Sequence, residues 1–427
     1  CALPISYLPI RKCFFAMSDR RVDPDDGVAY TWEEFSAYYK RTFKKAAIEA
    51  YWEKCTPAKK DKAKAKVKVK AQAKAKQKTQ KGSPHFGALS VMEADQSNPP
   101  SKRPGLAHRV TVSDLDPKML EMKYAVRGSV ANKAEEVAKA LADGADLGFK
   151  QMVPCNIGNP HAVHQKPISF YREVAACVLC PGILDFKSDS MPSDVVTRAK
   201  EYLAATGQNG VGSYTHSNGL IMVRRQIAAF IEKRDGFPCD VERLALTTGA
   251  SEGVKRCISA LIGSGDGLMI PCPQYPLYSA ALAMCGGEMV YYNLDEDKNW
   301  GISREELERS IKAATKKGTR VVSIAVINPG NPSGAVLDRA EVEMIITFAR
   351  DTKIVILADE VYQENIYKDG KSFHSFKKIL SELQKSDSSY EEVQLVSFHS
   401  TSKGLLGECG QRGGYAEFVG FSDRTMD

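Results

Sequence analysis

The half of the chain after Gly212 repeats one pattern, in which a short apolar run is followed by a turn and then by residues with helical spacing. The apolar runs lie in the segments RLALTTGA, GDGLMIPCP, EMVYYNL, VVSIAVINPG, KIVILADEVY and VQLVSFHS. Strands that are apolar throughout are buried on both faces, which is typical of a parallel sheet between helix layers. The sequence therefore predicts a three-layer α/β/α fold with a mostly parallel sheet, whose ligands bind beyond the carboxyl ends of the strands.

The N-terminal part has a different composition. Residues 59–81 hold eleven lysines and one acid, and the whole chain has a net charge of +7, so the remaining residues carry a net −3. A low-complexity basic run cannot bury a core. We expect a solvated linker there, and we favour it over contact with nucleic acid or an acidic lipid surface.

Three regions are expected along the chain. Residues 1–107 are predicted to form a disordered basic extension, with an amphipathic helix over 30–55, a Lys-rich segment over 58–81 and a linker. Residues 108–205 are predicted to form an N-terminal arm and part of a small domain. Residues 206–427 carry the alternating strands and helices and are predicted to form the large domain.

Eleven scattered cysteines indicate free thiols in an intracellular protein. Cys177 and Cys180 form a single CxxC, whereas structural zinc needs four ligands, so we expect no metal. No stretch of about 18 or more apolar residues occurs, so no membrane span is expected. The chain begins CALPISYLPIRKCFFA, without a convincing cleavage site. We expect a cytoplasmic protein, with the mitochondrion as the alternative.

Unusual residue types gather just past the predicted strands. They are the segments Gly249 to Ser251, Pro273 to Tyr275, Asn328 to Pro332, Asp359 to Tyr362, and Ser400 to Lys403. Because the carboxyl ends of parallel strands share one edge of a sheet, these segments are predicted to form one site.

Two hypotheses explain this site. In the first, Ser251 of GASEG is the nucleophile of a hydrolase, because G-x-S-x-G marks a strand-to-helix elbow. Asp359 and then His374 or His399 follow in the order Ser, Asp, His. This hypothesis leaves Lys403 and both Asn-Pro turns unexplained, and no HGGG-like oxyanion loop precedes the serine.

The second hypothesis is a pyridoxal phosphate site. This cofactor needs a lysine amine for a Schiff base, which Lys403 supplies, and a carboxylate on its pyridine nitrogen, which Asp359 supplies. Its phosphate needs backbone N–H groups at a helix start, which Ala250 and Ser251 provide.

Other residues at the strand ends suit the same cofactor. Arg412 and Ser400 add a charged fork and a hydroxyl donor for the phosphate. Tyr275 can stack on the ring, and Asn331 and Tyr362 can hydrogen-bond to its 3′ oxygen. One cofactor thus accounts for every unusual residue type at these positions.

A series of longer motifs points to a known family. In order they are KYAVRG, NIGNPHA, PISFYREV, TTGASEG, IPCPQYPLYSA, VINPGNPSG, LADEVYQENIY, FHSFKK and SFHSTSKGLLGECGQRGGY. From about Val110 to Phe421 the chain resembles the alanine aminotransferases, which are fold-type I pyridoxal-phosphate enzymes of aminotransferase class I/II. PQYPLYSA, and STSKG followed by GECG, are specific to the alanine branch.

The resemblance implies transfer of the amino group of L-alanine to 2-oxoglutarate, giving pyruvate and L-glutamate, by ping-pong chemistry at Lys403. It implies a homodimer in which Tyr214 reaches the phosphate of the neighbouring subunit. It also places the backbone of Gly158 near the substrate carboxylate. The alternatives are glutamate–glyoxylate transamination on the same fold, and a non-catalytic homologue tethered by its basic tail.

The chain departs from the family at its C-terminal end. The family continues well beyond Arg412, into a C-terminal small domain that carries the arginine for the substrate α-carboxylate. This chain stops at Asp427, and no candidate for that arginine can be named. We therefore expect a fragment with an incomplete small domain, which by itself is inactive or nearly so.

Overall fold

A computed structural model describes residues 21–22, 29–30, 32, 35–36, 45–57, 116–122, 124, 128–153, 155, 157–187, 190–207 and 210–426. The chain divides into two compact units, Cys1–Ser101 and Lys102–Asp427. The predicted Lys-rich segment 58–81 and the first twenty residues lie outside the described residues.

The first unit contains a small antiparallel sheet of order β2-β1-β3 and one described helix. Its elements are β1 (Arg21–Val22), β2 (Ala29–Tyr30), α2 (Lys45–Trp52) and β3 (Thr56–Pro57). Phe35 and Trp52 are buried in its core, with their ring centroids 5.0 Å apart. The prediction of a single helix over 30–55 is therefore wrong at its start, where Tyr30 belongs to β2. Aromatic residues three and four positions apart can also come from separate segments that pack into one core, as Phe35 and Trp52 do here.

The second unit is built on a seven-stranded sheet of order β4-β10-β9-β8-β7-β5-β6. The strands are β4 (Leu244–Thr247), β5 (Asp266–Cys272), β6 (Glu288–Asn293), β7 (Arg320–Ile327), β8 (Val355–Asp359), β9 (Leu395–Ser400) and β10 (Gly414–Val419). The pairs β5–β6, β5–β7, β7–β8 and β8–β9 are parallel, and β10 is antiparallel to both β9 and β4.

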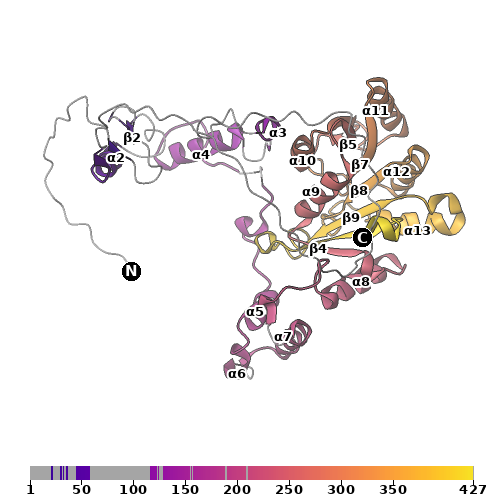
Figure 1. Ribbon diagram of the computed structural model, residues 1–427, viewed down its shortest axis with the longest axis horizontal. Helices are drawn as coiled ribbons and strands as arrows, with labels where there is room; N and C mark the ends of the chain where they lie inside the picture. The colour runs from indigo at the N-terminus through magenta and orange to yellow at the C-terminus, as the bar shows by residue number, and fades with distance from the viewer. Residues whose placement is uncertain are drawn as a thin grey trace, which may run out of the picture. The chain divides into compact units, whose positions relative to one another are not determined.

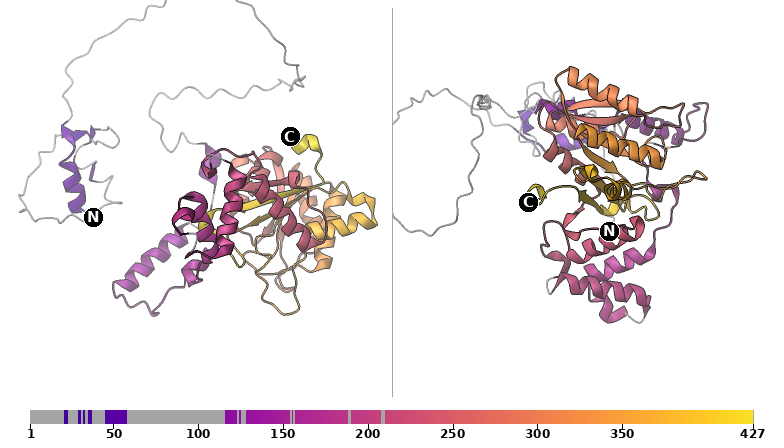
Figure 2. Two further views of the ribbon diagram at one scale, coloured as in Figure 1. Left: turned by 90° about the horizontal axis from the view of Figure 1, so that it is seen from below. Right: turned by 90° about the vertical axis from the view of Figure 1, so that its right-hand side faces the viewer.

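Helices cover both faces of this sheet (Figure 1). One layer contains α9 (Ala250–Leu261) and α10 (Leu277–Cys285), and the other contains α11 (Arg304–Lys316), α12 (Arg339–Thr352) and α13 (Phe376–Ser386). Successive residues of β7 face the two layers in turn: Ile324 and Val326 pack with α11, α12 and α13, and Ala325 and Ile327 with α9 and α10. The view from the side of α11 to α13 shows these helices in front of the strands (Figure 2). The predicted three-layer fold with a mostly parallel sheet is confirmed.

The remaining helices are α3 (Pro117–Glu121), α4 (Ser129–Ala142), α5 (Ser169–Leu179), α6 (Ile183–Lys187), α7 (Ser193–Thr206), α8 (Ile221–Asp235) and α14 (Asp423–Met426). Of these, α8 packs on β4 and β10 through Ala228 and Ile231. Helices α5 to α7 share a core around the buried Cys177, whereas Cys180 is exposed just after α5. Among the described residues, no helix is both long and apolar enough to cross a membrane, and no cluster of side chains suits a metal ion.

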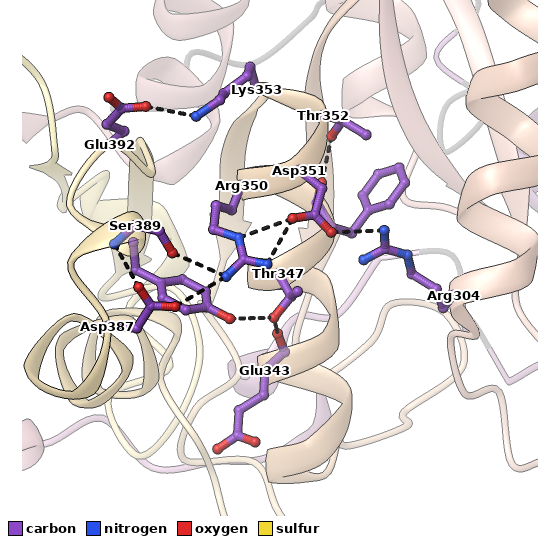
Figure 3. Close-up of polar contacts among 12 residues, drawn as sticks. Arg304, Glu343, Thr347, Arg350, Asp351, Thr352, Lys353, Asp387, Ser389 and Glu392 are labelled. Carbon is purple, nitrogen blue, oxygen red and sulfur yellow. Dashed lines mark hydrogen bonds and ion pairs between the residues drawn. The ribbon is translucent and has the colours of Figure 1, made fainter.

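A polar network joins the end of α12 to the 3-10 helix η7 (Ser388–Tyr390), which follows α13 (Figure 3). The Arg350 guanidinium donates to Asp351 at 2.9 and 3.0 Å and to Ser389 at 3.2 Å. It also lies 4.4 Å from the ring centroid of Tyr390, whose hydroxyl is 3.0 Å from that of Thr347. This contact fixes the C-terminal end of α12 against the segment that leads into β9.

Candidate active site

Three neighbouring strands end together at one edge of the sheet. Strand β8 lies between β7 and β9, and in the parallel register Ile327 is opposite Asp359, which in turn is opposite Phe398. The segments that follow these strands carry Asn331, Tyr362 and Lys403, which are therefore brought together as the sequence predicts.

Asp359 is the last residue of β8, and its side chain is only 5% exposed. Its Oδ2 accepts a hydrogen bond from the hydroxyl of Tyr278 at 2.8 Å. Its Oδ1 is buried and has no hydrogen-bond partner among the described residues. Burial raises the pKa of this carboxyl group, and the hydrogen bond from Tyr278, the nearby backbone N–H of Val361 and the charge of Lys403 partly oppose that rise. Asp359 thus presents one free, buried acceptor atom.

Lys403 lies three residues after β9 with its amine turned toward the same edge. Its Nζ donates to the carbonyl oxygen of Gly158 at 3.0 Å and lies 5.5 Å from the ring centroid of Tyr362. Burial lowers the pKa of this amine, while Cys409 and Asp359 act in the opposite direction. Lys403 is thus within electrostatic reach of Asp359, and more of its amine is neutral than in an exposed lysine.

Side chains around the amine form two hydrogen-bonded pairs. The amide of Asn331 donates to the hydroxyl of Tyr362 at 3.3 Å, and burial raises the pKa of that hydroxyl to about 12. The hydroxyls of Tyr275 and Tyr124 are 2.5 Å apart. Ser400, at the end of β9, is buried and accepts from the backbone N–H of Ser402 at 3.3 Å.

The start of α9 forms a cradle beside Arg412. Ala250 and Ser251 open the helix, and the preceding Gly249 has a φ of 85°. A Cβ on Gly249 would lie 2.2 Å from Nη2 of Arg412, so a larger residue would collide with the guanidinium. Arg412 donates to the carbonyl groups of Cys409 at 2.9 Å and Thr248 at 3.2 Å. Free N–H groups and a guanidinium thus lie side by side, which suits an anionic group.

Some of the predicted residues lie apart from this cluster. Tyr214 is fully exposed. His399 stacks on Phe230, with the ring centroids 6.4 Å apart, and His374 Nε2 lies 3.3 Å from the hydroxyl of Ser372. Neither contact turns a histidine toward Ser251, so the geometry gives no support to the hydrolase hypothesis.

Sequence reasoning missed Tyr278. It named Tyr275, three residues earlier, and predicted a helix through YPLYSAALAMCGG, so a second tyrosine one turn further along was visible. The structure buries Tyr278 completely, and a buried tyrosine hydroxyl requires a partner. That partner is Asp359, which lies 81 positions further along the chain.

The residues present fit pyridoxal phosphate. The free Oδ1 of Asp359 suits a protonated ring nitrogen, and the cradle at Gly249 and Arg412 suits a phosphate. The neutral form of Lys403, favoured by burial, suits attachment of a carbonyl compound.

Comparison with known proteins agrees with this site. The family model for aminotransferase class I and II matches residues 176–418. The chain belongs to this family, whose members depend on pyridoxal phosphate, so the resemblance predicted from the motifs is confirmed at the level of the family.

The similar proteins include two kinds of aminotransferase. Glutamate–glyoxylate aminotransferase 1 of Arabidopsis thaliana is 45% identical over 73% of this chain and 63% of that protein. A probable mitochondrial alanine aminotransferase of Dictyostelium discoideum is 43% identical over 73% of this chain and 59% of that protein. The chain thus spans about three fifths of the length of these relatives.

A solved structure gives the same fold. Alanine aminotransferase from Pyrococcus furiosus aligns with a TM-score of 0.55 and 23% identity, over 73% of this chain and 65% of that one.

Proposed function

We propose that the chain is the cofactor-binding part of an enzyme that transfers the amino group of L-alanine to 2-oxoglutarate, with pyridoxal phosphate as the cofactor. The observation that carries this proposal is the pair formed by Asp359 and Lys403 at neighbouring strand ends. One provides a buried carboxylate with a free oxygen, and the other provides an amine with a lowered pKa.

When bound, pyridoxal phosphate supplies an electron sink for the carbanion that forms at the substrate α-carbon. Asp359 Oδ1 would accept the hydrogen bond of the protonated ring nitrogen. Arg412, Ser400 and the first N–H groups of α9 would hold the phosphate. In its neutral form, Lys403 Nζ would remove the proton from the substrate α-carbon as a general base. As the resulting ammonium it would deliver that proton to the cofactor carbon that keeps the amino nitrogen, and not back to the α-carbon.

The remaining site residues orient the cofactor and the substrate. Asn331 and Tyr362, which hydrogen-bond to each other, would bind the ring oxygen, and Tyr275 would stack on the ring. In the chain without cofactor, the carbonyl group of Gly158 accepts a hydrogen bond from the Lys403 amine.

Chemical trapping tests this proposal without a substrate. We expect pyridoxal phosphate and borohydride to attach the cofactor to Lys403, as located by mass spectrometry. Lys403→Ala should abolish the attachment, and Lys312→Ala, an exposed lysine on α11, should leave it unchanged. Attachment elsewhere, or none, contradicts the proposed function.

The substrate pair needs its own experiment. L-alanine with 2-oxoglutarate is the first proposal, because PQYPLYSA and STSKG with GECG resemble the alanine branch of the family. L-glutamate with glyoxylate is the second, because of the 45% identical relative that carries that name. The ratio of kcat/KM for the two pairs, measured on the intact protein, decides between them.

The proposal extends to assembly and compartment. We propose a homodimer, because the exposed Tyr214 matches a residue that crosses the subunit boundary in the family. Sedimentation tests this assembly. We propose the cytosol as the compartment, with the mitochondrion as the alternative because several similar proteins are named as mitochondrial. A fluorescent fusion of the intact protein tests that choice.

A further inference from the structure

Two segments that are far apart in the sequence meet around Lys403. We call residues 157–172 the arm segment and residues 401–413 the lysine loop. The arm segment contains the 3-10 helix η3 and the start of α5, and the lysine loop follows β9. Their contact at the amine is the hydrogen bond from Lys403 Nζ to the carbonyl oxygen of Gly158, at 3.0 Å.

An ion pair joins the same two segments beyond this contact. Arg172 donates from Nε to Oε1 of Glu408 at 3.4 Å and from Nη2 to Oε2 at 3.3 Å. The Glu408 side chain is 7% exposed, and that of Arg172 is 49% exposed. A buried carboxylate without a partner is costly, so the chain resists the separation of Arg172 from Glu408. The two parallel contacts also fix direction, which a single contact does not.

Glu408 is itself anchored to the base of the lysine loop. Its backbone N–H donates to the carbonyl oxygen of Thr401 at 2.9 Å, and its own carbonyl accepts from Gln411 N–H at 3.1 Å. The hydrogen bond between Glu408 and Thr401 thus joins the two ends of a loop that contains Lys403. A partner held by Glu408 is held at a fixed place relative to Lys403.

The middle of the interface is closely packed. Nε2 of Gln165 donates to the carbonyl oxygen of Leu405 at 3.0 Å. At Gly407, whose φ is 57°, an added Cβ would lie 3.1 Å from Cβ of Pro160 and 3.0 Å from Nε2 of Gln165. The ion pair therefore adds to an interface in which the arm segment and the lysine loop are already in close contact.

We propose that Arg172 and Glu408 are positioning residues for Lys403: their ion pair holds the arm segment on the lysine loop and keeps the Gly158 carbonyl at the amine. This inference rests on the proposed function only where it gives Lys403 the chemical role. Neither residue touches the substrate or the cofactor in this scheme, and both act through the arm segment.

The experiment measures access to the Lys403 amine in the full chain without cofactor. A small acylating reagent is applied over a range of pH, and mass spectrometry follows the labelling of each lysine. The plateau at high pH, where the amine is neutral, reports access. We expect Arg172→Gln and Glu408→Gln each to raise the plateau of Lys403 about five-fold, because the arm segment opens more often. Arg172→Lys, which keeps the charge without the fork, should fall between the wild type and Arg172→Gln.

The double variant tests whether the two residues act as one unit. Its plateau should equal that of the larger single variant, and a plateau equal to the product of the two effects overturns the proposal. Lys377, which is 4% exposed, is the internal reference. A parallel rise at Lys377 means general unfolding and also overturns the proposal.

Lys353→Gln is the matched control variant, since it removes an exposed ion pair of 2.7 Å with Glu392 that involves neither segment (Figure 3). It should leave the Lys403 plateau unchanged. Unchanged plateaus in both the Arg172 and Glu408 variants overturn the proposal, and Arg172→Gln, at a half-exposed position, remains informative should Glu408→Gln fail to fold. The labelling needs no cofactor, so a failure of cofactor trapping would count against the proposed function alone.

Discussion

Asp359 and Glu360 are adjacent buried carboxylates that lie in two different regions of the molecule. Successive side chains of a strand point to opposite faces of a sheet. Asp359 meets Tyr278 of α10, whereas Glu360 meets the other helix layer. Oε1 of Glu360 accepts from the backbone N–H of Phe376 at 2.8 Å, and Oε2 accepts from the hydroxyl of Ser397 at 2.5 Å.

The difference between them separates a structural carboxylate from one that awaits a ligand. Both oxygens of Glu360 have partners, so its burial is compensated within the chain. Asp359 keeps Oδ1 free in a buried place, which costs stability and is typical of a functional group. Burial raises the pKa of both groups, so the pKa alone does not distinguish them.

Asp359→Asn gives the largest expected effect. We expect the rate of amino-group transfer by the intact protein to fall about 10³-fold, since the ring nitrogen loses its charged partner. The free energy of unfolding without cofactor should change by less than ~1 kcal/mol, because no satisfied interaction of Oδ1 is lost. Steady-state rates and urea unfolding measure the two effects. A large loss of stability with little loss of rate would make Asp359 a structural residue like Glu360.

Glu360→Ala should show the opposite pattern. It leaves the Phe376 N–H and the Ser397 hydroxyl without their acceptor and opens a cavity, so we expect a loss of ~4 kcal/mol in the free energy of unfolding. Urea unfolding at mildly acidic pH measures it. Glu391→Ala, at an exposed position, is the control and should change stability little. A Glu360 variant as stable as this control would end the contrast with Asp359.

The third expectation concerns pH. In the folded chain the pKa of Glu360 is raised from 4.5 to about 7, so the folded state binds more protons than the unfolded state between these values. The stability that Glu360 contributes is therefore complete below about pH 4.5 and is lost as the pH rises to about 7, by ~3 kcal/mol.

The difference in unfolding free energy between the wild type and Glu360→Gln, measured across that range, isolates this contribution. The pKa of His399 is lowered to about 4, so its contribution to stability changes with pH in the opposite direction. That contribution is the same in the wild type and in Glu360→Gln, so it cancels in the difference. A difference that does not vary with pH would show that Glu360 titrates normally.

Tyr278→Phe gives the smallest expected effect. The loss of one hydrogen bond to Asp359 should lower the free energy of unfolding by ~1 kcal/mol. It should also raise the pKa of Asp359 further, because that hydrogen bond favours the ionised form. Urea unfolding measures the first effect, and the acidic limb of the kcat profile of the intact protein measures the second. An unmoved limb would show that Tyr278 only fills space.

Much of the fold was accessible from local sequence. The strands β4 to β9 lie where apolar runs predict them, and the helices α9, α10 and α12 lie where helical spacing predicts them. Strand β10 was not predicted, because its segment GYAEFV follows a glycine-rich loop. It lies between β9 and the edge strand β4 and is antiparallel to both, and β4 is far from it along the chain.

The sequence by itself determined the order of the elements and the residue types at the strand ends, because backbone preference and side-chain alternation are local properties. It therefore singled out Lys403 and Asp359. Tertiary structure alone decided which oxygen of Asp359 is free and that Arg172 meets Glu408 across 236 positions. Such contacts depend on which distant segments pack together, and no local pattern encodes that choice.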